Sequence, residues 1–206
     1  MELERNKNSQ LAAQVAKDNF LEAENCIKQF LAEKDNLDKV VSAAQIMAAA
    51  FKQGNKVMSC GNGGSMCDAM HFAEELSGKF REERPPLPAF AISDPGYLSC
   101  VSNDYGYQAV FERYIKAFGK KGDVLLAIST SGNSENVIRA VKAALAKEMT
   151  VVSLTGKDGG LMKTMDTLEI RAPYSRYADR AQEIHIKVIH SLIHLIEHQL
   201  LAEDEH

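Results

Sequence analysis

The sequence predicts an α/β fold in which helices cover both faces of a parallel sheet. From residue 56 onward, short runs rich in β-formers alternate with segments of helical spacing, which is the pattern of parallel sheets. Two of these runs end in turns rich in glycine or serine that open directly into a helical segment. The chain has 206 residues and shows no internal repeat or linker, so we expect one domain over residues 1–206.

Residues 9–53, ahead of the first expected strand, are predicted to form two amphipathic helices. Apolar residues recur there about every three or four positions, and no strand pattern interrupts them. Because an α/β domain can bury its own sheet without such additions, the apolar surface that these helices cover can belong to another copy of the chain.

Strands and helices then alternate to the end of the chain. We expect strands at residues 56–60, 88–93, 123–129, 150–154 and 167–171. We expect helices at residues 65–79, 107–118 and 134–146, a weaker one at 160–165, and one long helix at 177–201. An acidic tail at residues 203–205 is expected to be frayed.

The bulk composition argues against several functional classes. A net charge of −4 and a pI near 5.9 do not provide the basic field of a general nucleic-acid or membrane-surface binder. We expect the short basic run at residues 79–84 to be a solvated face. No apolar stretch approaches the ~20 residues of a membrane span, residues 1–7 lack a signal-peptide core, and the four cysteines form no CxxC pair. We therefore expect a cytoplasmic protein with reduced thiols.

The first candidate site is the turn at residues 60–65, Cys-Gly-Asn-Gly-Gly-Ser, which we call the glycine turn. A strand that turns through glycines into a helix surrounds a small space with backbone N–H groups and a positive helix end, which suits a phosphate. Met66 occupies the place of the third glycine of a dinucleotide fingerprint, and no Gly-Lys-Ser/Thr of a P-loop is present. The turn alone supports tight packing and anion binding equally.

The second candidate site is the serine loop, residues 129–134, with the sequence Ser-Thr-Ser-Gly-Asn-Ser. Four hydroxyls supply donors and acceptors, and Gly132 lets the backbone approach a ligand. Ser134 alone could serve as a helix N-cap, but four hydroxyls exceed what capping needs. Ligands of parallel sheets bind at the carboxyl edge of the strands, so the two loops predict one anion-binding crevice. A third polar turn, residues 155–160, is more simply explained as a plain turn.

Ionisable side chains accompany these loops. His71 and Glu75 share one helical face just after the glycine turn, where a surface pair is the alternative explanation. On the last helix, His190, His194 and His198 form a stripe at i, i+4 and i+8. A histidine near a helix end suits the helix dipole and needs no further function. Spacing alone does not choose between His190 and His194, and it predicts a zinc site only weakly.

Five segments of the chain form a combination that is specific to one family. They read CGNGGSMCDAMHFAEEL, AISDPGYLSCVSNDYGY, GDVLLAISTSGNSENVI, VSLTGKDGG and YADRAQEIHIKVIH. Together they resemble the bacterial phosphoheptose isomerase family of the sugar isomerase (SIS) domain superfamily, over residues 40–197. The resemblance implies a flavodoxin-like α/β/α sandwich around a five-stranded parallel sheet. It also implies a homotetramer with active sites at subunit interfaces, and residues 9–53 are then the oligomerisation segment.

The resemblance also implies the site residues. The family's zinc ligands match His71, Glu75, Gln182 and His190, one zinc per subunit, which favours His190 over His194. The family's substrate contacts match Asn62, Gly63, Gly64, Asn103, Asp104, Ser129, Thr130, Ser131 and Ser134, with Glu75 and Gln182 shared; Ser65 belongs to the same loop. Met66 in place of a histidine, Lys79 in place of an arginine and an N terminus longer by about ten residues depart from the family, and none is a matched ligand.

The family reaction converts the ketose sedoheptulose 7-phosphate into the aldose D-glycero-D-manno-heptose 7-phosphate, a precursor of lipopolysaccharide heptose, by proton transfer through an enediol. We expect Glu75 to be the base at carbon and His190 the acid/base at oxygen. Because a metal ligand is not fully free to act as a base, Asp104 or Asp179 could assist.

Two non-enzymatic classes compete with this prediction. One is an adaptor with the sugar isomerase fold that binds a replication initiator protein. The four matched zinc ligands argue against it, since an adaptor does not need them. The other is a sugar-phosphate-sensing regulatory domain, and no helix-turn-helix segment or basic arm accompanies this chain.

Overall fold

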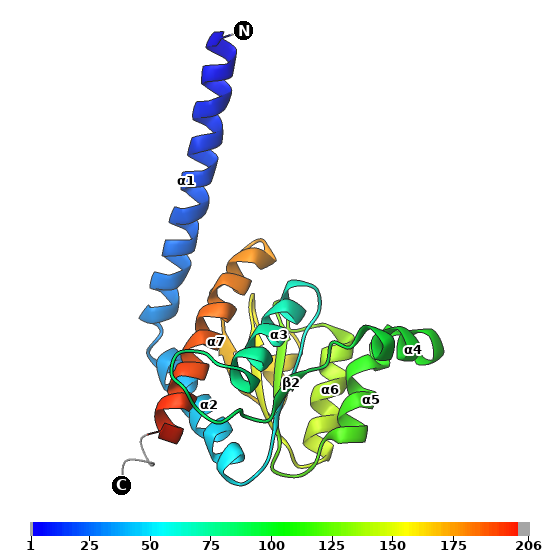
Figure 1. The fold of residues 1–206 in the computed structure, drawn as a ribbon. Coiled ribbons are helices and arrows are strands. Elements are labelled where there is room, and N and C mark those ends of the chain that lie inside the picture. The colour runs from blue at the N-terminus through cyan, green and yellow to red at the C-terminus, as the bar shows by residue number, and fades with distance from the viewer. Residues whose placement is uncertain (1, 202–206) are drawn as a thin grey trace.

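The computed structural model describes the backbone of residues 2–201 and the side chains of residues 8–201. It contains one parallel sheet with strand order β2-β1-β3-β4-β5 (Figure 1). The strands are β1 (Val57–Cys60), β2 (Ala89–Ala91), β3 (Val124–Ser129), β4 (Thr150–Thr155) and β5 (Leu168–Arg171). The helices are α1 (Glu2–Ala32), α2 (Lys34–Lys52), α3 (Gly64–Ser77), α4 (Pro95–Tyr105), α5 (Val110–Phe118), α6 (Glu135–Ala146) and α7 (Ala178–Leu201). The acidic tail at 203–205 lies outside the described residues.

Helices cover both faces of the sheet and form two separate cores. On one face α2, α3 and α7 pack around residues such as Met47, Phe72 and Leu192. On the other face α4, α5 and α6 pack around Phe111 and Val141. Every residue of β1 and β3 is buried, as expected for central strands of a parallel sheet. The α/β/α sandwich and its five-stranded sheet confirm the predicted fold class.

The strand order places a topological switch point between β1 and β3. The chain leaves β1 toward the edge strand β2 and returns to β3 on the other side of β1. In doubly wound sheets, ligands bind at the carboxyl ends of the strands that flank this point. The glycine turn follows β1 and the serine loop follows β3, so the fold brings the two candidate loops to one edge.

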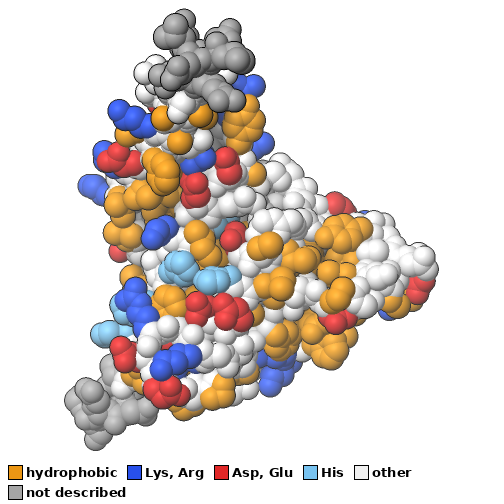
Figure 2. Space-filling model, turned by 45° about the horizontal axis from the view of Figure 1, so that its top comes forward, with side chains coloured by type: hydrophobic (Ala, Val, Ile, Leu, Met, Phe, Trp, Pro, Cys, Tyr) orange, Lys and Arg blue, Asp and Glu red, His pale blue; other side chains and the backbone are white. Residues whose placement is uncertain are grey.

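The two N-terminal helices have different environments. The expectation that both cover a surface outside this chain's own sheet is wrong for α2, which packs on α7 and the sheet and buries Val40, Ala44 and Met47. Helix α1 instead projects from the body (Figure 1) and exposes apolar side chains along its length (Figure 2). The exposed residues are Leu11, Val15, Phe20, Leu21, Ile27 and Leu31.

Two segments differ from the sequence prediction. Helix α4 (Pro95–Tyr105) was not predicted, because its residues lack a regular apolar spacing. Its start signal is local: Asp94 accepts a hydrogen bond from the Tyr97 N–H at 2.6 Å, and Pro95 takes the first helical position. The weak helix expected at 160–165 is a single 3₁₀ turn, Met162–Thr164.

No helix within residues 2–201 is both long and apolar enough to cross a membrane. The four cysteines are free thiols, and Cys26 and Cys60 are buried.

Candidate functional site

The glycine turn is fastened to the start of α6 by a pair of asparagines. The Nδ2 of Asn62 donates to Oδ1 of Asn136, and the Nδ2 of Asn136 donates to Oδ1 of Asn62, both at 2.8 Å. The hydroxyl of Tyr107 donates to the same Asn62 oxygen at 3.1 Å. Gly63 adopts a positive φ of 55°, which glycine tolerates without strain. The turn is therefore held in one conformation beside the helix that follows the serine loop.

The first residues of α3, which follow directly from the glycine turn, are tightly packed against α7. Ser65 is buried, and a Cβ atom at Gly64 would collide with the side-chain amide of Gln182 from α7. Gln182 therefore lies directly against the N terminus of α3. A side chain at position 64 would push the amide of Gln182 out of this place.

The serine loop is closed on itself by hydroxyl contacts. Ser129 Oγ donates to Ser134 Oγ at 2.9 Å, and the Asn133 N–H donates to Ser131 Oγ at 3.1 Å. Ser134 occupies the N-cap position of α6, but its side chain does not cap the helix. The alternative explanation of Ser134 as a side-chain cap is thus wrong, and the positive end of α6 faces a loop rich in hydroxyls.

The third turn, residues 155–160, supports the serine loop. The two residues that directly follow this turn donate hydrogen bonds to the loop, from the Leu161 N–H to Asn133 Oδ1 at 2.9 Å and from the Met162 N–H to the Gly132 carbonyl at 3.0 Å. Gly132 has a φ of 64°, and a Cβ atom there would collide with the carbonyl of Gly159. The third turn is therefore a backbone support for the serine loop, which its sequence did not reveal.

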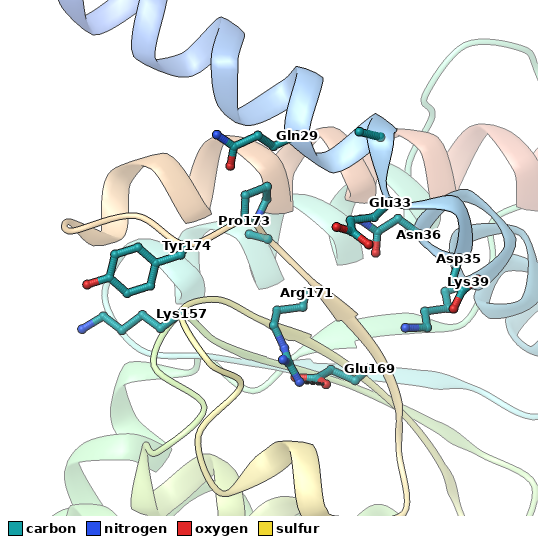
Figure 3. A pocket seen from close by; sticks show the side chains of 12 residues that line it. Gln29, Glu33, Asp35, Asn36, Lys39, Lys157, Glu169, Arg171, Pro173 and Tyr174 are labelled. Carbon is teal, nitrogen blue, oxygen red and sulfur yellow. Dashed lines mark hydrogen bonds and ion pairs between the residues drawn. The ribbon is translucent and has the colours of Figure 1, made fainter.

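A cavity of about 540 Å³ lies behind this support, between the start of α2 and the end of β5 (Figure 3). Its wall contains an ion pair between Arg171 and Glu169. Burial alone would raise the pKa of Glu169, but hydrogen bonds from Arg171 and Thr155 outweigh it and hold the pKa below its usual value. None of the residues predicted to bind substrate or metal lines this cavity, which therefore lies apart from the candidate site.

Helices α3 and α7 bring an ionisable cluster together from distant parts of the chain. Nε2 of His71 lies 3.0 Å from Nε2 of His190 and 3.5 Å from Oε1 of Glu75. On its other side, Nδ1 of His71 lies 3.4 Å from Oε1 of Glu74. Burial, followed by the charges of His71, Lys187 and Arg81, lowers the pKa of His190, so the neutral imidazole is favoured near pH 7.

The donor set of this cluster fits a zinc ion. A carboxylate beside Nδ1 of His71 favours the tautomer that carries the proton there and leaves the Nε2 lone pair free. Two nitrogen ligands, each about 2.0–2.1 Å from a tetrahedral zinc, are about 3.3 Å apart. The 3.0 Å between the His71 and His190 nitrogens is close to this separation. Within residues 8–201, the side chains of His71, Glu74 and Glu75 also form a group suited to a metal ion.

The structure brings together three of the four implied metal ligands. His71, Glu75 and His190 meet, whereas Gln182 contacts Gly64, about two helical turns before His71 on α3. His194 contacts Arg81 at 3.2 Å, so of the two histidines that spacing left open it is His190 that lies beside His71 in this chain. Glu74, which the sequence prediction missed, is signalled by its position three residues after His71.

His185 is fully buried, its Nε2 lies 2.8 Å from the Thr155 carbonyl, and burial lowers its pKa to about 4. Asp68, on α3 near His71, has a buried carboxylate oxygen without a hydrogen-bond partner in the described part of the chain. Burial raises the pKa of Asp68 to about 6, against a smaller lowering by His71. His198 lies in the last turn of α7, where a cation suits the helix dipole.

Asn103 and Asp104 lie on α4, which extends from the body on the side away from α7 (Figure 1). Asn103 Nδ2 donates to Asp104 Oδ1 at 2.8 Å, the Cys100 thiol lies 3.9 Å from Asp104 Oδ2, and Asn103 and Asp104 are both exposed. Within one chain the structure does not bring these predicted substrate contacts to the cluster of His71 and His190.

The expected solvated face at residues 79–84 is wrong for its last residue. Lys79 is exposed and pairs with Glu83, but Arg84 is buried and pairs with the buried Glu197 at 2.8 Å. A run of local charges cannot reveal this, because the partner of Arg84 lies 113 residues further along the chain.

Comparisons with known proteins agree with this geometry. The SIS domain family model matches residues 20–156. The chain is 61% identical to the phosphoheptose isomerase of Edwardsiella ictaluri over 181 residues, which are 88% of this chain and 94% of that protein. The structure of phosphoheptose isomerase from Neisseria gonorrhoeae is similar with a TM-score of 0.83 and 40% identity, over 91% of this chain and 98% of that one. A phosphoheptose isomerase structure from Francisella tularensis gives 0.85 and 34%, over 90% and 97%.

Proposed function

The chain belongs to the phosphoheptose isomerase family of SIS-domain enzymes, and from this premise we propose that it converts D-sedoheptulose 7-phosphate into D-glycero-D-manno-heptose 7-phosphate. This reaction is the first step toward ADP-heptose for the lipopolysaccharide core. The observation that carries the proposal is the meeting of His71, Glu75 and His190 on helices that start from the same sheet edge as two anion-binding loops.

The substrate phosphate binds at the serine loop in this proposal. The hydroxyls of Ser129, Thr130, Ser131 and Ser134 and the N terminus of α6 supply donors to an anion. Asn62, Gly63, Gly64 and Ser65 form the neighbouring wall of the crevice. Binding energy from the remote phosphate positions the reacting end of the sugar.

The isomerisation moves a carbonyl from C2 to C1. Glu75 takes a proton from C1 and returns it to C2, and His190 moves a proton between the two oxygens, so the enediol forms and collapses without net gain or loss of protons. A neutral His190 is able to accept a proton, which agrees with its lowered pKa. Asp104 or Asp179 could assist if metal binding occupies Glu75.

We further propose one zinc ion per subunit, held by His71, Glu75 and His190. Gln182, the fourth ligand that the family resemblance implies, lies against Gly64 in this chain and would have to turn toward the cluster to bind the ion. When bound, the ion would polarise the substrate carbonyl and stabilise the developing negative charge on oxygen. Glu74 orients His71 from its Nδ1 side.

A homotetramer with active sites at subunit interfaces accounts for two features of the single chain. Helix α1, from residue 9 onward part of the segment 9–53, exposes a line of apolar side chains that a second copy can cover. Asn103 and Asp104 lie away from this chain's own cluster, so their contact with substrate requires the site of a neighbouring subunit. We place the enzyme in the cytoplasm, where its free thiols stay reduced.

The alternative, an adaptor that binds a replication initiator protein, needs no ionisable cluster. The decisive experiment incubates purified protein with sedoheptulose 7-phosphate and follows the aldose product by NMR, alongside several other ketose phosphates. We expect turnover of sedoheptulose 7-phosphate and loss of turnover after dialysis against a chelator. Turnover of another ketose phosphate alone would reassign the substrate, and an inactive zinc-loaded protein would favour the adaptor.

A further inference from the structure

The segment that connects α3 to β2 runs along one face of α7. The Phe80 ring stacks on the His190 ring with centroids 5.8 Å apart, Arg81 contacts His194, and Arg84 pairs with Glu197. The three partners on α7 are separated by four and three residues, so they lie on one helical face. The segment Phe80–Arg84, which we call the strap, therefore follows α7 for about two turns, beginning at a member of the ionisable cluster.

Arg84 anchors the strap to both helices at once. Its Nε donates to Glu197 Oε1 on α7 at 2.8 Å. Its two terminal nitrogens donate to the carbonyls of Leu76 at 2.7 Å and Glu75 at 2.6 Å, at the C-terminal end of α3. The side chains of Arg84 and Glu197 are only 2% and 3% exposed. One planar guanidinium thus joins the end of α3 to α7 through three short hydrogen bonds.

The C terminus of α3 needs such a group. The last carbonyls of a helix have no partners within it and carry partial negative charge, and the last turn of α3 contains no basic residue. Arg84 supplies the missing cation and donors from outside the helix. Because one of its acceptors is the backbone carbonyl of Glu75, the contact acts on the residue that faces His71.

A buried ion pair is a poor means of gaining stability. The cost of removing two charges from water is about as large as their mutual attraction, and well-packed apolar replacements are often as stable. Glu197 also leaves its second carboxylate oxygen without a partner among the described residues. The pair is better explained by the geometry that it fixes, since its directional bonds hold α3 and α7 in one register.

We propose that Arg84 and Glu197 are positioning residues that keep Glu75 and His190 in their places beside Nε2 of His71. This role rests on the proposed function, because it needs a reaction in which these two side chains act together. The proposal gives a role to Arg84, the basic residue that ends the run 79–84. It predicts that loss of the ion pair disturbs the geometry of the cluster more than that of the phosphate-binding loops.

The test replaces both members with apolar residues of similar length, as Arg84→Met/Glu197→Met. We expect the variant to remain folded, with kcat lower by about 10–100-fold and zinc affinity, measured by competition with a chelating dye, weaker by about 10–100-fold. We expect KM to change by less than about threefold, because the serine loop is held by separate contacts. Amide exchange in residues 75–78 should become at least about tenfold faster.

The matched control is Lys121→Met/Glu148→Gln, which removes an ion pair of 2.7 Å between distant segments at the exposed surface. It should leave kcat, zinc affinity and exchange in α3 unchanged. Arg84→Lys keeps the positive charge but loses the planar guanidinium with its several N–H donors, so the losses of kcat and zinc affinity should be intermediate. If the double variant does not fold, the same measurements on Arg84→Lys test the proposal.

The outcomes separate this proposal from the proposed function. Faster exchange with normal kcat and normal zinc affinity would reduce the pair to a purely structural tie and overturn the positioning role. Unchanged exchange would overturn it as well. If the wild-type protein binds zinc but does not isomerise sedoheptulose 7-phosphate, the proposed reaction fails while a loss of zinc affinity in the variant still supports positioning. If the wild type neither binds zinc nor turns over any ketose phosphate, both proposals fall.

Discussion

The serine loop is held by contacts within six residues and by one neighbouring turn, whereas the cluster of His71, Glu75 and His190 is assembled across 119 residues of sequence. The loop presents hydroxyls and backbone groups, and its shape follows from glycine geometry and short-range hydrogen bonds. The cluster presents imidazoles and a carboxylate, and its shape follows from how α3 lies against α7.

This difference separates binding from chemistry. A backbone-built loop keeps its form when single side chains change, so substitutions there should act mainly on KM. A cluster built from side chains on two helices depends on each member and on the helix register, so substitutions there should act mainly on kcat. The following predictions test that division, beginning with the largest expected effect.

Glu75→Gln should lower kcat by about 10³-fold while KM changes little, because loss of a general base typically costs 10²–10⁴-fold. The substitution keeps the size of the side chain and removes its ability to accept a proton. Steady-state kinetics with sedoheptulose 7-phosphate measure both constants. Glu82→Gln, at an exposed position in the strap, is the control and should match wild type. A kcat within tenfold of wild type in Glu75→Gln would remove Glu75 from its proposed role.

Gly132→Ala should lower kcat/KM by about 10²-fold, mainly through KM, because a displacement of about 1 Å in a binding group has effects of this size. The new Cβ would meet the Gly159 carbonyl and would also occupy a φ of 64°. Gly54→Ala is a matched control, since Gly54 has a φ of 72° with nothing within 4 Å of the added atom. Equal effects in the two variants would mean that backbone strain, and not the contact between the two loops, is responsible.

The same contrast explains what the sequence could predict. The glycine turn and the serine loop are recognisable from the sequence, because the residues that form each loop are consecutive. Each loop is a run of glycine or hydroxyl residues between a strand pattern and a helix pattern. The strand pattern was recognisable for the same reason, and helix α4 was missed because its signal consists only of Asp94 and Pro95 at its start.

The cluster could not be read in this way. Choosing His190 over His194 depends on the rotation of α7 against α3, which neither helix encodes alone. Arg84 looked like part of a solvated run because its partner, Glu197, lies 113 residues away. The support of the serine loop by the third turn likewise appears only when β3 and β4 are paired.

The buried His185, which bonds to the Thr155 carbonyl at the start of the third turn, should make the free energy of unfolding depend on pH. Its pKa is lowered in the fold to about 4 from 6.5, so between these values the unfolded chain binds more protons and stability falls as the pH falls. The contribution of His185 to this loss between pH 7.5 and pH 5 should be about 2 kcal/mol. Urea unfolding of the wild type and of a His185 variant at both pH values, at one protein concentration, measures it as a difference.

His185→Gln keeps a donor for the Thr155 carbonyl and does not titrate, so it should lose about 2 kcal/mol less between pH 7.5 and pH 5. The pKa of Asp68 is raised to about 6, so this group acts in the opposite direction and favours the folded state as the pH falls toward 3.8. Its contribution is the same in the variant and in the wild type, and it drops out when the two are compared. Identical pH profiles of variant and wild type would show that His185 is not held neutral in the fold.

Tyr107→Phe should have the smallest effect, a rise in KM of about two- to fivefold, because it removes one exposed hydrogen bond worth about 1 kcal/mol or less. Asn62 keeps both bonds to Asn136, so the glycine turn stays in place and only the freedom of its amide increases. The control Tyr105→Phe retains the ring that stacks on Arg113 and should leave KM unchanged. A loss in kcat as large as that of Glu75→Gln would mean that the Tyr107 hydroxyl takes part in proton transfer. The glycine turn around Asn62 would then belong to the catalytic part of the site and not only to the binding loops.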